Sequence, residues 1–262
     1  MIALLAFPQQ TMIHRSSKNA QKLDVAGLNE ITVLIDRSET ALSEVAFNSW
    51  SPGLDGPPHA HEAKEQNFFL LSGRGEIVIG ADRFPAEPGD FFYVPAGVVH
   101  QSINLNKGKR LDYFLFNAFL DSKKEGHASF AAHINLVKET RRKQADSQQS
   151  GVQPALAANS RRGMKVSTQS LNALSTTIIS REQTQKCEAV HHAIPPNARF
   201  DLRADACKEQ TLYIASGSGL VEMGGESANI TAGETIYVPA GAPGSIAAGP
   251  TGLKAVSFGT IV

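Results

Sequence analysis

Cysteine is scarce in this sequence: its 262 residues include only Cys187 and Cys207. Two thiols in a chain of this length do not make a disulfide framework, so we expect both to be reduced and the protein to be cytoplasmic. Long apolar runs are lacking too, because no segment approaches the roughly 18–20 residues that span a bilayer. The opening residues, MIALLAFPQQ, have no basic flank, which argues against a secretory signal and favours an N-terminal arm.

An excess of charge is also missing, since Lys and Arg total 25 and Asp and Glu total 25. This balance gives no footprint for nucleic acid or an anionic membrane surface, so we expect neither as a partner. A hydrophobic content of 42% with 19% charged residues is ordinary for a globular protein. The length allows one large domain or two of about 100–150 residues.

What the sequence does contain is a repeat with a constant offset of 144 residues. Tyr93–Gly97 and Tyr237–Gly241 both read YVPAG, and Lys64–Gln66 and Lys208–Gln210 both read KEQ. The same offset relates Gly73 to Gly217, Gly89 to Gly233, Arg37 to Arg181, Glu44 to Glu188 and Pro52 to Pro196. Because no gap is needed over some 70 residues, we interpret the chain as a duplication of one module.

Each module has the pattern of an all-β fold. Short runs rich in β-branched and aromatic residues, such as ITVLID, NFFLLSG and GEIVIG, alternate with turn signals such as SPG and EPGD. Segments such as FFYV are apolar on both faces, so both faces must be covered. The pattern predicts an antiparallel sandwich or small barrel in each half.

The segment between the copies, Asp121–Met164, is polar and reads mainly as a linker. Phe130, Ile134 and Val137 recur in it at helical spacing, which predicts a helix packed on a barrel. His127 and His133 also lie here, and we expect both at the surface.

Two motifs in the first half carry a family resemblance. The first is Gly53, then His59-x-His61, then Gln66 with four residues between it and His61, and Gly73 with six residues between it and Gln66. The second is GDFFYVPAGVVHQSIN, with its fixed places at Gly89, Pro95, Gly97, His100 and Asn104. With these motifs the chain resembles the cupin superfamily, in its two-domain (bicupin) form.

The resemblance implies two tandem cupin barrels, of the double-stranded β-helix or jelly-roll type, joined by a partly helical linker. The predicted organisation is an N-terminal arm at residues 1–27, a metal-binding cupin at 28–120, a linker at 121–165 and a degenerate cupin at 166–262. Barrels of this family commonly pair through sheet edges, so we expect a monomer or a homodimer.

The spacing predicts a metal site in the first barrel. His59 and His61 alternate along an extended segment and project to one face, and His100 arrives from a distant strand. Three imidazoles with one oxygen donor suit a divalent transition metal (Zn, Ni, Fe, Mn or Cu) better than Mg or Ca. Residues sharing the ligands' parity, Phe68, Leu70 and Ser102, are expected to line the substrate cavity.

The fourth ligand departs from family usage, which is a glutamate. Two spacings select Gln66, with four residues between His61 and Gln66 and six between Gln66 and Gly73, and we favour its side-chain carbonyl. The alternative is that Glu65 is the ligand through a β-bulge and Gln66 is incidental. The second copy keeps both residue types in the same order, so a glutamine can persist there for structural reasons alone.

The second half lacks these ligands. The offset carries His59 to Arg203, His61 to Asp205 and His100 to Gly244. A guanidinium has no lone pair for a metal, so we predict a metal-free second barrel whose role is packing.

Four neutral ligands would leave the charge of a divalent ion uncompensated, which favours a small anionic, oxygen-rich substrate such as a keto acid or sugar acid. Several cupins with a His-x-His-x4-Gln site open or tautomerise sugar-derived acids, so the resemblance implies isomerase or lyase chemistry. Two alternatives stay open: an Fe(II)-dependent dioxygenase, and a non-catalytic small-molecule-binding cupin. The sequence identifies no catalytic acid or base.

Overall fold

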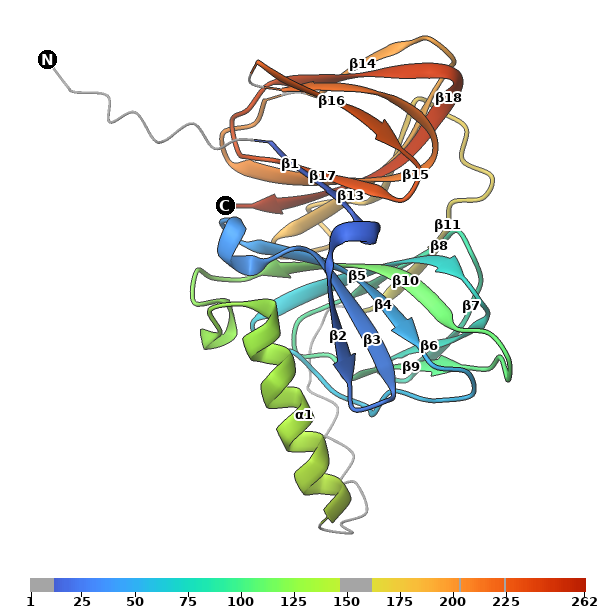
Figure 1. Cartoon of the computed structure of the whole chain (residues 1–262), viewed down its shortest axis with the longest axis vertical. Helices are drawn as coiled ribbons and strands as arrows, with labels where there is room; N and C mark the ends of the chain where they lie inside the picture. Colours follow the sequence, from blue (N-terminus) through green and yellow to red (C-terminus); the bar gives the residue numbers. More distant parts are fainter. Residues whose placement is uncertain (1–11, 147–161, 203, 224) are drawn as a thin grey trace, which may run out of the picture.

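The protein consists of two β-barrel units that face each other through broad sheets, with one long helix beside the first unit (Figure 1). The computed structural model describes residues 12–146, 162–202, 204–223 and 225–262. The expected all-β fold of two tandem barrels with a partly helical linker is confirmed. The domain boundaries stay a prediction, although strands already begin within residues 1–27.

The first unit pairs a seven-stranded sheet, in the order β11-β8-β5-β10-β4-β3-β2, with a three-stranded sheet, β7-β6-β9. Along most of these strands, buried and more exposed side chains alternate or the residues are apolar throughout, as the sequence predicts for sheets covered on both faces. Their bounds are β2 Gln21–Val25, β3 Asn29–Ile35, β4 Ser43–Trp50, β5 Lys64–Ser72, β6 Gly75–Ile79, β7 Asp82–Ala86, β8 Asp90–Val94, β9 His100–Asn104, β10 Leu111–Phe119 and β11 Met164–Ser167.

The second unit is one curved sheet with the path β1-β17-β15-β18-β13-β12, on which β14 pairs with β18 and β16 with β15. Register shifts along the long β15–β18 pairing accompany its curvature into a barrel (Figure 1). The bounds are β1 Ile13–Ser16, β12 Ser175–Ile179, β13 Cys187–Ile194, β14 Arg199–Leu202, β15 Lys208–Met223, β16 Glu226–Thr231, β17 Glu234–Val238 and β18 Gly244–Ile261.

The two units exchange edge strands. Strand β1, which precedes the first unit in the chain, pairs with β17 of the second, and β11, which opens the second half, pairs with β8 of the first. Within these pairs Ile13 lies opposite Tyr237, and Met164 lies opposite Tyr93. Each exchange covers a sheet edge with main-chain hydrogen bonds and ties the two units together.

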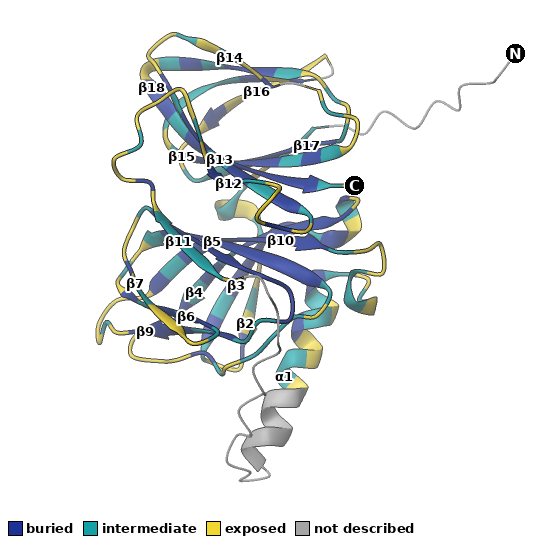
Figure 2. Ribbon diagram, turned by 180° about the vertical axis from the view of Figure 1, so that it is seen from behind, coloured by how far each residue is buried: buried dark blue, intermediate teal, exposed yellow. Residues whose placement is uncertain are grey.

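The sheets that face each other bury a shared apolar cluster, visible as dark strands between the units (Figure 2). At its centre Phe114 and Phe258, which occupy equivalent places in the repeat, stack with ring centroids 5.1 Å apart. Phe116 lies 5.1 Å from the same Phe258 ring. Burial of aromatic surface of this kind is the main source of stability at such an interface.

Two buried carboxylates fasten the interface in a reciprocal way. Glu65 accepts hydrogen bonds of 2.8 Å from the main-chain N–H groups of Gln185 and Lys186, and another from the Tyr93 hydroxyl. One repeat later, Glu209 accepts 2.9 and 3.0 Å bonds from residues 41 and 42 and a 2.7 Å bond from Tyr237. Each unit therefore supplies the glutamate that holds a turn of the other.

Helix α1, Phe130–Asp146, packs against the mouth of the first barrel (Figure 1). Phe130 and Ile134 are buried in the core cluster of that barrel, and Val137 packs against it, so the predicted helix with an apolar stripe is confirmed. In the described part of the chain, no helix combines the length and the apolar character that a membrane span requires.

Candidate metal centre

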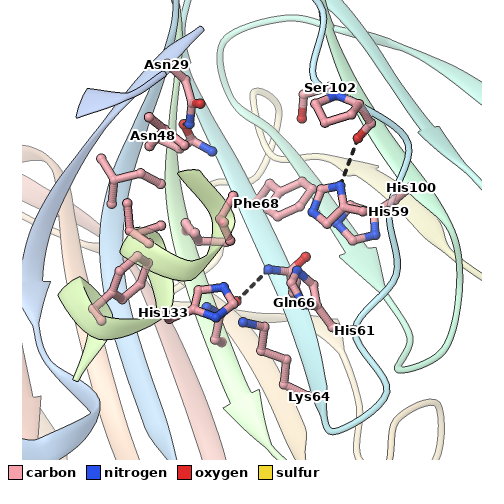
Figure 3. Close-up of a pocket in the computed structure, with 18 of the residues that line it drawn as sticks. Asn29, Asn48, His59, His61, Lys64, Gln66, Phe68, His100, Ser102 and His133 are labelled. Atoms are coloured by element: carbon pink, nitrogen blue, oxygen red, sulfur yellow. Dashed lines mark hydrogen bonds between the residues drawn. The ribbon is translucent and has the colours of Figure 1, made fainter. Parts of the chain in front are cut away.

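Three histidines converge inside the first barrel (Figure 3). His100 begins β9, and it exchanges two main-chain hydrogen bonds, of 3.1 and 2.8 Å, with His59 on the segment before β5. His61 lies two residues beyond His59 along that segment and projects to the same side, as the alternation predicts. One ring nitrogen from each of the three lies within 4.8 Å of the others.

The ring orientations of His59 and His100 are fixed by main-chain carbonyls. Nδ1 of His59 lies 3.0 Å from the carbonyl oxygen of Pro57, and Nδ1 of His100 lies 3.2 Å from that of Val98. A carbonyl oxygen can only accept, so each Nδ1 carries the proton and donates. The lone pair of each imidazole is therefore on Nε2, the atom through which it would bind a cation.

His61 is oriented by a carboxylate. Its Nδ1 lies 3.2 Å from Oε1 of Glu125, which comes from the linker before α1. The other oxygen, Oε2, binds the buried Nζ of Lys64 at 2.9 Å. Burial would raise the pKa of Glu125, but the charge and hydrogen bond of Lys64 outweigh it and lower the pKa below its usual value. The pair resembles the carboxylate–histidine arrangement that supports metal ligands in many proteins.

The loop that delivers Glu125 has an unusual backbone. Lys124 and Glu125 both have positive φ angles, 48° and 61°. Among residues other than glycine, this conformation is uncommon and is found mainly at Asn and Asp. Arg37 donates a 2.9 Å hydrogen bond to the carbonyl of Lys124, whose ammonium binds the carbonyl of Thr40 at 2.6 Å. Such strain persists where surrounding contacts enforce it, and here it directs a carboxylate at the histidine cluster.

Two of the imidazoles, those of His61 and His100, are held in their neutral form. Burial, followed by the charges of nearby cations and histidines, lowers the pKa of His61 and of His100 well below 6.5. A neutral imidazole is the form that binds a metal, so the cluster needs no large deprotonation at neutral pH.

Gln66 presents an oxygen to the same cavity. Its Nε2 donates a 2.9 Å hydrogen bond to Oδ1 of Asn117, while its buried Oε1 has no hydrogen-bond partner. Asn117 in turn donates 2.7 Å from Nδ2 to Glu44, which Arg37 binds through two nitrogens at 2.6 and 2.9 Å. This chain of hydrogen bonds fixes the orientation of the side-chain amides of Gln66 and Asn117, because it identifies the nitrogen and the oxygen of each. A buried acceptor without a partner is costly, and a cation beside the imidazoles would satisfy it.

The neighbouring Glu65 projects to the other face of β5, where it makes the interface bonds described above. Adjacent strand residues face opposite sides, so the strand cannot present both side chains to the cavity. The pair Glu209-Gln210 in the second copy has the same explanation, because Glu209 is the residue with the matching interface role.

A cavity of about 350 Å³ adjoins the cluster. Phe68 and Ser102, two of the three residues expected to line it, do so, whereas Leu70 is buried in the hydrophobic core and is not among the lining residues. The helix was expected only to pack on the barrel, and α1 also forms one wall of this cavity, with Phe130, His133, Ile134, Leu136 and Val137.

His133 was expected at the surface, and the structure places it in the cavity wall instead (Figure 3). Its ring centroid lies 6.1 Å from that of His61, and its Nδ1 is buried, 3.9 Å from Glu125. Burial, aided by the charge of Lys64, lowers its pKa to about 3, so the ring is neutral. His133 lies three positions after Phe130, which puts both on one side of the helix, although this spacing does not show that the side lines a cavity.

The second barrel offers no comparable cluster among the residues that the structure describes. Asp205, in the place of His61, forms a 3.0 Å ion pair with Arg181, and Gly244, in the place of His100, has no side chain. Arg203, in the place of His59, lies outside the described residues.

Comparison with known proteins agrees with this architecture. Residues 49–115, which include all the motif residues of the site, match the model of the Cupin domain. No curated protein sequence matches the chain. The resemblance to the cupin superfamily drawn from the two motifs is thereby confirmed.

Solved structures share the fold at low sequence identity. Protein Ylba from E. coli superposes with a TM-score of 0.71 at 12% identity, covering 97% of this chain and 92% of that one. Oxalate decarboxylase from Bacillus subtilis, a Mn(II) protein, has a TM-score of 0.65 at 14% identity, with coverages of 94% and 76%. Salicylate 1,2-dioxygenase from Pseudoaminobacter salicylatoxidans, in complex with gentisate, has a TM-score of 0.58 at 12% identity, with coverages of 84% and 69%.

Proposed function

We propose that this protein, a member of the cupin superfamily, is a metal-dependent enzyme acting on a small anionic molecule in its first barrel. His59, His61 and His100 would bind one divalent transition metal through Nε2, and Gln66 through Oε1. The observation that carries the proposal is the buried, unpartnered Oε1 of Gln66, held beside three imidazoles whose Nδ1 atoms are already engaged. The donor set fits Zn, Ni, Fe, Mn or Cu.

The charge of the site favours an anionic substrate. All four proposed ligands are neutral, and among the described residues lining the cavity the only ionised side chain is Lys64. That ammonium is paired with Glu125 at 2.9 Å and with Glu44 at 3.7 Å, so its charge is already balanced. When bound, the metal would supply Lewis acidity for isomerase- or lyase-type chemistry on a keto acid or sugar acid.

The residues around the ligands have defined supporting roles in this proposal. Glu125 holds the proton on Nδ1 of His61, and the network from Asn117 to Arg37 keeps the Gln66 carbonyl turned inward. His133 presents a neutral ring to the same cavity and can hydrogen-bond a substrate there. The second barrel is proposed to be metal-free, with the role of burying the outer face of the catalytic sheet.

The metal assignment is tested by elemental analysis of protein purified without added metal. We expect about one divalent transition ion per chain in the wild type and almost none in His61→Ala. The variant His14→Ala, at an ion-paired histidine far from the cavity lining, serves as the matched control and should keep the metal. An unchanged metal content in His61→Ala would eliminate the first barrel as the site.

The reaction class is tested by the requirement for oxygen. Anaerobic turnover of a keto acid or an unsaturated sugar acid by the metal-loaded protein would support isomerase or lyase chemistry. Oxygen consumption that depends on added Fe(II) would instead assign the protein to the dioxygenases. Binding without turnover by any metal form would identify a non-catalytic binding protein.

A further inference from the structure

The cavity beside the proposed metal site is polar at one end and, apart from His133, apolar along its helical wall. The wall opposite the histidines is built by Ile134 and Val137 of α1, which face Val25, Ile31 and Leu115 of the barrel. All five pack in or against one hydrophobic cluster, and none offers a hydrogen bond through its side chain.

The polar side chains farther from the histidines are bonded to one another. Asn29 donates a 2.7 Å hydrogen bond to Asn48, which donates 2.9 Å to the Tyr113 hydroxyl. The same hydroxyl also binds Ser102 and Trp50, each at 3.0 Å. A network closed in this way can accept a single polar substituent, but it is not an array of donors and acceptors waiting for several hydroxyl groups.

We propose that the substrate is a small α-keto or α-hydroxy acid with an apolar body, and not a polyhydroxylated sugar acid. This inference rests on the proposed function, because the oxygen-bearing head group is placed at the neutral-ligand metal site. The body lies against Ile134 and Val137, where a hydroxyl group beyond the reach of His133 would lose its water without finding a partner. A volume of about 350 Å³ is near the lower end for ligand pockets, which sets a small size.

The test is a calorimetric titration of Zn-loaded protein with three acids that share a head group. Pyruvate consists of the α-keto acid head group with only a methyl group attached. α-Ketoisocaproate carries an apolar side chain on the same head group, and γ,δ-dihydroxy-α-ketovalerate carries a polar side chain of similar size. Burying its three additional carbon atoms predicts that α-ketoisocaproate binds about tenfold or more tighter than pyruvate, and the dihydroxy acid no tighter than pyruvate.

A variant of the helical wall makes the test specific to the cavity. Val137→Ser should weaken α-ketoisocaproate several-fold and leave pyruvate unchanged, because only the longer acid reaches α1. Asn135→Ser, at an exposed position of the same helix, is the matched control and should alter neither.

The outcomes separate this inference from the proposed function. Equal or tighter binding of the dihydroxy acid, with pyruvate still bound, would overturn the apolar-body assignment and leave the metal site intact. Failure of all three acids to bind the Zn-loaded protein would overturn both. Equal affinity for α-ketoisocaproate with and without Zn would show that the metal does not bind the head group, and this would overturn the proposed placement of the substrate.

Discussion

Replacing Gln66 with glutamate should destabilise the metal-free protein, although glutamate is the residue that cupins ordinarily use at this place. The amide of Gln66 donates 2.9 Å to Oδ1 of Asn117, and that oxygen cannot be exchanged for a donor. The reason is that Nδ2 of Asn117 is occupied by Glu44, which Arg37 holds through two nitrogens. In the Gln66→Glu variant, two acceptor oxygens would therefore meet in a buried site.

The loss of stability in Gln66→Glu has a lower and an upper limit. Leaving a buried acceptor facing another acceptor costs roughly 1–3 kcal/mol, and more for a charged group. The variant can avoid this repulsion by taking up a proton, which restores a donor toward Asn117. At pH 7.5, protonating a carboxyl whose ordinary pKa is about 4.3 costs about 4 kcal/mol, which is the upper limit. We expect a loss of about 2–4 kcal/mol at pH 7.5, with a smaller loss at pH 5.5.

The assay is urea unfolding of chelator-treated protein at the two pH values. The matched control is Gln210→Glu, the equivalent position of the second barrel, which is only partly buried and should change stability by less than about 0.5 kcal/mol. Added Zn should restore the Gln66→Glu variant more than the wild type, because the cation neutralises the new carboxylate. A metal-free Gln66→Glu protein as stable as the wild type at pH 7.5 would refute the assigned orientation of the amide.

Three further predictions follow from contacts around the site and the interface. Glu125→Gln should weaken metal binding about 10-fold or more, measured by competition with a chelator, because it removes the carboxylate that orients His61; an unchanged affinity would exclude that role. Glu65→Gln should lower stability by about 2–4 kcal/mol in chemical denaturation while leaving metal content intact, since it places an NH₂ group against main-chain N–H donors. Glu209→Gln should lower stability by a similar amount. A loss of metal in Glu65→Gln would indicate that Glu65 is a metal ligand after all. The stability of the metal-free protein should fall as pH drops below 6.5, because unfolding frees His61 and His100 to take up protons that burial denies them in the folded state. A melting temperature that does not change from pH 7.5 to 5 would contradict this.

The fold and the position of the site could be predicted because they depend on local spacing. Alternation along an extended strand brings His59 and His61 to one face, and the repeat indicates that the chain holds two copies of one module. Parity also separates Glu65 from Gln66, although it does not say which of the two faces the cavity. The structure supplies that answer through contacts made 51 residues away with Asn117 and 120 residues away with Gln185.

The supporting residues of the site could not be predicted for a related reason. Glu125 reaches His61 only because two consecutive residues adopt a left-handed backbone that other parts of the fold enforce. Its sequence neighbours, in a polar linker, give no sign of this conformation. His133 is placed by the direction in which α1 crosses the barrel mouth, which depends on where its apolar stripe finds a partner. Tertiary contacts, and not sequence patterns, decide both positions.

Strand β5 explains why one motif was kept in both copies and the histidines in one. Its outer face carries Glu65, and a reciprocal interface needs a glutamate from each unit, so the second copy repeats it as Glu209. Its inner face carries Gln66 beside the three imidazoles, and the second copy keeps the glutamine, as Gln210, without a histidine cluster among the described residues. The two demands act on opposite faces of the same strand and are physically separate. A change confined to the inner face, such as His61→Ala, should therefore remove the metal and leave the packing of the two barrels intact, which metal analysis and denaturation of one sample can show together.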